Sequence, residues 1–119
     1  MINVSYILFF KALSNDTRLR IVDLLRSGSR NATEIGKALD IEQSMVSHNL
    51  TCLINCGFVT AKQFGKNKVC SLNKETVIPL LEIIDRHTRE YGKNLEGCAV
   101  LRDVRKRFPE NKAEELKVP

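Results

Sequence analysis

Two short helical patterns separated by only three residues constrain the fold of this chain more than any other feature. The first covers residues 33–39, where Ile35 and Leu39 recur at helical spacing, and the second covers residues 43–56. A three-residue link leaves the two helices no room to separate, so they must pack against each other. We therefore predict a helix-turn-helix, in which the second helix is the one that contacts DNA.

This second helix has one apolar face and one polar face. The apolar face repeats at Val46, Leu50 and Leu53, so the opposite arc faces solvent. Four polar side chains occupy that arc: Ser44, Ser47, His48 and Thr51. Side chains of this kind let a helix approach base edges closely, and they offer hydrogen-bond donors and acceptors to read them. These four are the predicted base-reading residues.

A β-hairpin is predicted directly after this helix. Residues 58–63 and 68–72 are rich in β-forming side chains, and the glycine-containing stretch 64–67 between them suits a tight turn. Three lysines of the hairpin suit contacts with phosphates or with the minor groove: Lys62, Lys66 and Lys68. Such contacts determine how the protein is oriented on DNA and how strongly its affinity depends on salt, more than which sequence it prefers. A hairpin at this place is the wing of a winged helix-turn-helix.

The flanking segments predict helices that extend beyond a single core. Residues 7–13 carry apolar side chains at helical spacing, and residues 19–25 do so again, with Leu19 on the inner face, before the pattern ends near Gly28. The helix that begins near Lys74 carries more apolar surface than one stripe can hold, so part of it faces a partner chain. We predict a mainly α chain with a β-hairpin wing (α+β), a homodimer that pairs through its first and last helices.

Length and charge agree with one such domain. A chain of 119 residues with 43% apolar side chains can build one modest core. We expect residues 1–97 to form the DNA-binding and dimerisation domain, and residues 98–119 to form a charged C-terminal tail that is helical at most in part. The net charge of +5 favours an anionic partner.

The expected compartment is the cytoplasm. Residues 1–13 lack a basic region followed by a small-residue cleavage site, and no apolar run approaches the roughly 20 residues that span a membrane. We expect no membrane partner and no small-molecule substrate. In a reducing compartment, the four cysteines serve metal binding or thiol chemistry more often than disulfides.

Cys52 and Cys56 are the strongest candidate metal ligands. They are four residues apart on one predicted helix, so their β-carbons lie about 5–6 Å apart and both sulfurs can reach one ion. A disulfide would need roughly 3.8 Å between the same carbons. Ligation by thiolates alone selects soft ions, so Cd(II), Pb(II) or Zn(II) is the expected effector. The alternative is that both thiols are small apolar groups packed beneath the wing.

Three stretches of the chain resemble the ArsR/SmtB family of metalloregulatory repressors, over about residues 5–98. They are KALSNDTRLRI at residues 11–21, VSHNLTCLINCGFV at residues 46–59, and the wing around Gly65. The resemblance implies a dimer that binds a palindromic operator without metal and leaves it when metal binds. Members often carry histidine directly before the leucine that is Leu50 here, where this chain has Asn49.

Within the family, Cys52, Cys56 and Cys98 are similar to the thiolates of the cadmium- and lead-sensing CmtR-type repressors. The resemblance implies that the ion is held by the two cysteines of the recognition helix together with Cys98 of the partner subunit. The first residue of the predicted tail would then complete the metal site.

Three further residues are weaker candidate ligands. Cys70 faces the same side of its predicted strand as Leu72, which indicates a core position more than a ligand. Asp85 and His87 resemble the Asp-x-His pair that other sensors of the family use on the last helix, but the later positions of that site fall at Cys98 and at a leucine.

Two other functions stay open. A repressor of the same fold could respond to oxidation, by pairing Cys98 with Cys52 or Cys56 across the dimer. A winged-helix module could also bind protein and no DNA. An enzyme is not expected, because two histidines and scattered carboxylates form no recognisable pair of nucleophile and base.

Overall fold

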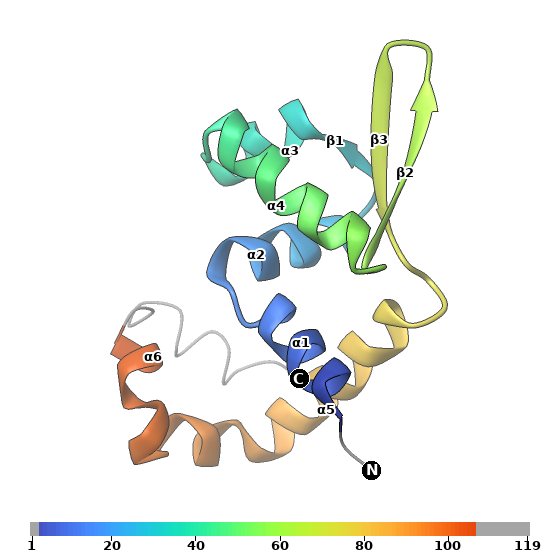
Figure 1. Ribbon diagram of the computed structural model, residues 1–119. Coiled ribbons are helices and arrows are strands. Elements are labelled where there is room, and N and C mark those ends of the chain that lie inside the picture. The colour runs from blue at the N-terminus through green and yellow to red at the C-terminus, as the bar shows by residue number, and fades with distance from the viewer. Residues whose placement is uncertain (1–2, 107–119) are drawn as a thin grey trace. The chain divides into compact units, whose positions relative to one another are not determined.

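The computed structural model describes residues 3–106 of the chain. Its elements are α1 (Val4–Leu13), α2 (Asp16–Leu25), β1 (Arg30–Asn31), α3 (Ala32–Leu39), α4 (Gln43–Asn55), β2 (Val59–Phe64), β3 (Asn67–Leu72), α5 (Val77–Glu96), the 3-10 helix η1 (Ala99–Leu101) and α6 (Arg102–Lys106) (Figure 1). The strands form an antiparallel sheet in the order β1-β3-β2. Helices α3 and α4, followed by the β2–β3 hairpin, make a winged helix-turn-helix, which confirms the predicted fold.

Asparagine side chains determine where α2 and α3 begin. At the start of α2, the Asn15 side chain accepts a hydrogen bond of 3.0 Å from the Arg18 backbone N–H. At the start of α3, Asn31 and Glu34 form a reciprocal capping box with hydrogen bonds of 2.8 and 2.9 Å. These side chains satisfy backbone N–H groups that have no partner within the helix.

The turn between α3 and α4 brings the two helices close together. Asp40 has left-handed backbone angles (φ 55°) and ends α3, and the next N–H, that of Ile41, donates to the Gly36 carbonyl at 3.0 Å. Gly36 is buried, and a Cβ there would lie 2.6 Å from Nε2 of Gln43. In the structure, the Gln43 side-chain amide occupies this space and donates a hydrogen bond to the Ala32 carbonyl at 3.0 Å. The absence of a side chain at Gly36 therefore leaves room for the Gln43 amide and for the Ile41 carbonyl oxygen, which a Cβ would approach to 3.1 Å.

The apolar face of α4 lies in the core. Val46 and Leu53 are fully buried and Leu50 is nearly so, which confirms the predicted stripe. The neighbouring elements supply the other core side chains of this region, among them Ile21, Val22, Leu25, Ile35, Phe58, Val59 and Leu72. Leu19, by contrast, is 46% exposed, so its assignment to the inner face of α2 is wrong. The buried residues of α2 define a face of the helix, and Leu19 lies outside it.

The wing extends from the sheet as a two-residue hairpin. Phe64 pairs with Asn67 across the turn, and Gly65 has a positive φ of 60° at the first loop position, as a type II′ turn requires. Both observed strands lie within one residue of their predicted bounds. Strand β1 was not predicted, because two residues are too few to show alternation.

The chain divides into two compact units, residues 1–78 and residues 79–119, and the division falls inside α5. The first unit holds the winged helix-turn-helix. In the second, η1 and α6 show that residues just after Gly97 are helical, while residues 107–119 of the predicted tail lie outside the described part of the chain. Among residues 3–106, no helix is long and apolar enough to span a membrane.

Candidate nucleic-acid interface and thiol site

The outer arc of α4 carries the four predicted base-reading side chains. Ser44, Ser47, His48 and Thr51 are all exposed, because the apolar stripe of the same helix is buried. The Thr51 hydroxyl donates to the Ser47 carbonyl at 2.9 Å, so its oxygen keeps only its acceptor capacity for a ligand. The arc offers short side chains with both donors and acceptors at the surface.

His48 and Asn49 are neighbours on one helix but differ in exposure. His48 is exposed, whereas Asn49 is 6% exposed and its side chain is bonded within the protein. The histidine of this chain is therefore at the protein surface, and the asparagine is not.

The three predicted wing lysines, Lys62, Lys66 and Lys68, are all exposed but do not share one face. Lys62 pairs with Val69 and Gln63 pairs with Lys68. Because side chains alternate along a strand, Lys62 and Lys68 extend from opposite faces of the hairpin, and Lys66 lies in its turn.

Phe64 is an exposed residue of the wing that is not among the predicted DNA contacts. It shares the face of Lys62, two residues earlier, and its side chain is 61% exposed. The sequence places it in the predicted turn stretch 64–67, whereas the structure makes it the last residue of β2.

Cys52 and Cys56 meet at the C-terminal end of α4. Cys52 is half-buried and Cys56 is exposed, and the two side chains lie one helical turn apart. Partial desolvation raises the pKa of the Cys56 thiol, the adjacent Cys52 raises it further, and the positive charge of Arg18 opposes both effects. Two thiols one helical turn apart fit two positions of a soft-ion site, and both must lose their protons when a cation binds.

Cys70 has different surroundings. It is 2% exposed on β3, and burial raises the pKa of its thiol while the positive charge of Lys68 opposes that rise. Leu72, two residues on, is buried on the same face, so the predicted core position of Cys70 is confirmed.

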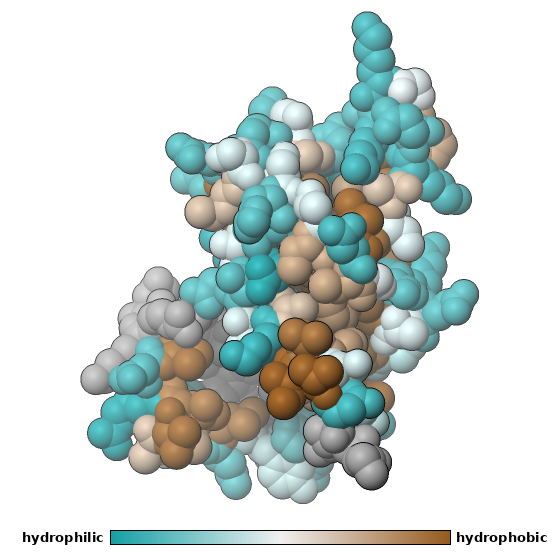
Figure 2. Space-filling view, in the orientation of Figure 1, coloured by the Kyte–Doolittle hydropathy of each residue, from teal (hydrophilic) through white to brown (hydrophobic). Residues whose placement is uncertain are grey.

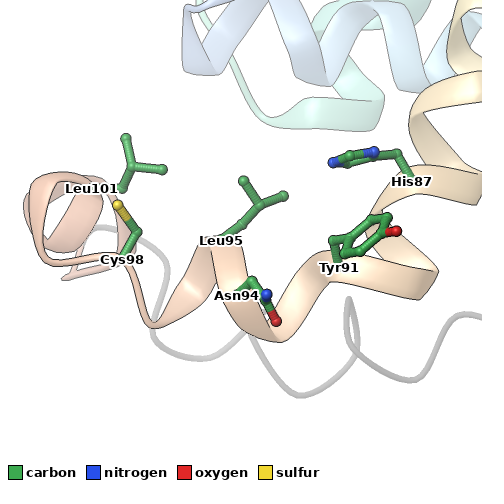
Figure 3. Close-up of a pocket in the computed structure, with 6 residues that line it drawn as sticks. All are labelled: His87, Tyr91, Asn94, Leu95, Cys98 and Leu101. Atoms are coloured by element: carbon green, nitrogen blue, oxygen red, sulfur yellow. The ribbon is translucent and has the colours of Figure 1, made fainter.

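Cys98 and His87 lie in the second unit, around a shallow hollow of about 360 Å³. Figure 3 shows His87 and Tyr91 at one end of this hollow and Cys98 with Leu101 at the other, with Leu95 between them. The His87 ring packs against the Tyr91 ring with a centroid distance of 4.9 Å. The hollow therefore does not gather the candidate ligands of this unit around one point.

No group of three or more His, Cys, Asp or Glu side chains that could hold a metal occurs within residues 3–106 of one chain. Cys98 is half-buried just before η1, and Asp85 is half-buried on α5. The structure thus brings Cys52 and Cys56 together, and the participation of Cys98, Cys70, Asp85 and His87 stays a prediction.

Comparison with known proteins identifies the family. Residues 15–61 match the family described as bacterial regulatory protein, arsR family. The chain is 36% identical to the probable mercury resistance operon repressor of Streptomyces lividans over 90 residues, which cover 76% of this chain and 72% of that protein. The chain belongs to the ArsR family. It is also 34% identical to a cadmium resistance transcriptional regulatory protein CadC homolog of Staphylococcus aureus, over 68% of each chain.

A solved structure of an ArsR-type protein has the same architecture. It is the homodimeric winged helix-turn-helix DNA-binding domain (fragment 1–100) of Mb0332 from Mycobacterium bovis, a possible ArsR-family transcriptional regulator. The identity is 31%, the alignment covers 67% of this chain and 74% of that one, and the TM-score is 0.63. As an ArsR-family member, this chain is a transcriptional regulator with a DNA-binding fold and not an enzyme, as predicted.

Proposed function

We propose that this ArsR-family chain is a homodimeric repressor whose metal-free form binds a palindromic operator. A soft divalent ion, Cd(II), Pb(II) or Zn(II), releases the DNA when it binds Cys52 and Cys56 together with Cys98 of the partner subunit. The observation that carries this proposal is the placement of the Cys52 and Cys56 thiols one helical turn apart, at the end of the helix whose outer arc faces solvent.

The place of the thiols on α4 supports a direct effect of the ion on DNA reading. Thr51 of the outer arc is adjacent to Cys52, so a ligand on the sulfurs acts on the same turn of helix that would face base edges. When bound, the ion would add its charge and fixed bond angles to this turn. The chain itself contributes two thiols that must release protons, so ion binding weakens as pH falls.

The surface of α1 supports the homodimer. Figure 2 shows hydrophobic side chains gathered over this helix. Six large apolar side chains of α1 are exposed: Val4, Tyr6, Ile7, Leu8, Phe9 and Phe10. A contiguous apolar surface of this kind marks an interface, and two-fold pairing is the commonest arrangement of soluble oligomers. A solved relative is described as homodimeric, which supports a dimer here.

The descriptions of the relatives support a metal ion as the signal that controls transcriptional repression. One is described as a mercury resistance operon repressor and another as a cadmium resistance regulator. Hg(II) and Cd(II) are soft ions that favour thiolate ligands, which agrees with the chemistry of a cysteine pair. We place the protein in the bacterial cytoplasm, where it can reach the chromosome.

The raised pKa of the Cys56 thiol argues against oxidation as the signal. Redox-sensing cysteines have a lowered pKa and an accessible thiolate, whereas the pKa of the Cys56 thiol is raised. Peroxide treatment followed by mass analysis tests this choice. A disulfide between Cys98 and Cys52 or Cys56 at low peroxide concentration would favour the redox repressor instead.

Cadmium titration of serine variants tests the proposal. Thiolate-to-metal charge-transfer absorbance should fall by about a third in each of C52S, C56S and C98S, if three equivalent thiolates bind the ion. C70S is the matched control and should keep the full absorbance, because Cys70 is buried on β3. Equal absorbance in C98S and wild type would remove Cys98 from the site.

The link to DNA needs a second measurement. A duplex selected from a random library by the metal-free wild-type protein serves as the probe. Cadmium should weaken its binding, and the duplex must weaken cadmium binding by the same factor. Equal cadmium affinity with and without the duplex would contradict the proposed mechanism, and failure to select any duplex would contradict the repressor itself.

A further inference from the structure

Asn49 makes a buried polar contact between α4 and the rest of the first unit. It is the one polar side chain among the buried residues whose exposure the structure describes. Its Oδ1 accepts a hydrogen bond of 3.1 Å from Nη1 of Arg18, and its Nδ2 donates to the Met45 carbonyl at 2.9 Å. A guanidinium can only donate a hydrogen bond and a backbone carbonyl can only accept one. The amide oxygen of Asn49 must therefore face Arg18, and its nitrogen must face the Met45 carbonyl.

Arg18 also closes the C-terminal end of α1. Its Nε donates to the carbonyl of Ala12, and its Nη2 donates to the carbonyl of Lys11 at 3.4 Å. The other two terminal carbonyls of α1, at Phe10 and Leu13, accept backbone N–H groups at 2.8 and 2.9 Å. Arg18 thus supplies half of the partners at this helix end, and its positive charge lies at the negative end of the helix dipole.

One guanidinium therefore joins three helices. Arg18 belongs to α2, and it bonds the end of α1 and the middle of α4. The planar fork of arginine can serve these acceptors together, whereas the single nitrogen of lysine cannot keep the same geometry. Asn49 directly follows His48 of the outer arc, so any movement of Asn49 also moves a predicted base-reading residue.

We propose that Arg18 and Asn49 are positioning residues that hold α4 at a set place relative to α1 and thereby select the spacing between the two half-sites of an operator. The inference rests on the proposed function, in which α1 forms the dimer surface. A dimer reads two half-sites with two copies of α4, so their separation depends on how each α4 is fixed to the shared interface. Neither residue needs to touch DNA.

Spacing preference distinguishes this role from a merely structural one. A residue that only stabilises the fold would, when changed, weaken binding to every duplex by a similar factor. A positioning residue would change the ratio of affinities between duplexes whose half-sites are differently spaced. The probes are the selected duplex and derivatives with one base pair inserted or removed between the half-sites.

Asn49→Leu and Asn49→Asp form the matched pair of variants. Leucine keeps the approximate volume and removes the acceptor for Arg18, while aspartate keeps the acceptor. We expect Asn49→Leu to lower the preference for the original spacing about tenfold, equivalent to about 1.4 kcal/mol. Asn49→Asp should keep that preference, even if its charge weakens binding to all duplexes equally. Asn55→Ala, at an exposed position of α4, is the control for substitution on this helix.

Arg18→Lys is the second test, in case Asn49→Leu does not fold. It keeps the charge at the end of α1, so we expect folding with the same loss of spacing preference. An unchanged affinity ratio in either folded variant would overturn the positioning role. Failure of the wild-type protein to bind any duplex would refute the proposed function instead, so the two failures are distinguishable.

Discussion

Cys70 and Cys56 have the same side chain in different surroundings. Cys70 is buried in the sheet, and Cys56 is exposed at the end of α4 beside a second thiol. The pKa of both thiols is raised, chiefly by desolvation, but only Cys56 has a neighbour with which it can share a cation. At the scale of the residue, surroundings separate a candidate ligand from a core side chain.

Cys70 should make the free energy of unfolding depend on pH in the alkaline range. Its pKa in the folded protein is raised above the ordinary value of 9.0, so the folded state keeps a proton that the unfolded chain has lost. The resulting stabilisation is present below pH 9.0 and is lost as pH rises through the folded pKa. Urea unfolding from pH 8 to 11 should show a steeper loss in wild type than in Cys70→Val. Parallel curves of stability against pH for the two proteins would contradict the raised pKa of the Cys70 thiol.

Short polar residues at element boundaries organise the helix-turn-helix and its wing. Asn31 caps α3 through Glu34 and also donates from Nδ2 to Oδ1 of Asn67 at 3.1 Å, at the end of the wing hairpin. Its backbone belongs to β1, which pairs with β3. One residue therefore connects the start of a helix with the strand that follows the wing turn.

Replacing Asn31 should separate these two roles. Asn31→Ala loses the cap and the bond to Asn67, and we expect the free energy of unfolding to fall by about 1–2 kcal/mol. Asn31→Ser keeps a capping oxygen but cannot reach Asn67 in the same way, so its loss should be smaller. Urea denaturation of both variants measures the difference. Equal losses would show that the contact with Asn67, and not the cap, carries the stabilisation.

The first unit, as a single chain, leaves apolar surface without a partner. The exposed side chains of α1 in Figure 2 contrast with the filled core around α4. A helix that is apolar on most of its surface is stable in water only when other surfaces cover it. At the scale of the whole molecule, this helix is the best-supported element of the proposed dimer.

Phe10→Glu should therefore weaken the dimer. The Phe10 side chain is 62% exposed in the single chain, and a carboxylate in its place would be buried without a partner at the proposed interface. Sedimentation velocity should show a shift from dimer to monomer at micromolar concentration. Phe64→Glu is the matched control, since Phe64 is 61% exposed on the wing. A dimer that survives in Phe10→Glu would move the interface away from α1.

The sequence by itself determined the features that depend on neighbouring residues. Helical and strand periodicities, the glycine turn at Gly65 and the exposed arc of α4 are local properties, and the chain shows them as predicted. The pairing of Cys52 with Cys56 is also local, because four residues on one helix bring two side chains together.

Only the tertiary structure decided which distant residues meet. Arg18 and Asn49 lie 31 residues apart, and neither spacing nor composition reveals that one caps α1 while it holds the other. Leu19 was misassigned and β1 was missed for the same reason, since burial and strand pairing depend on what packs against a segment. Contacts of this kind arise when separate elements pack into one core, so they cannot be deduced from any single element.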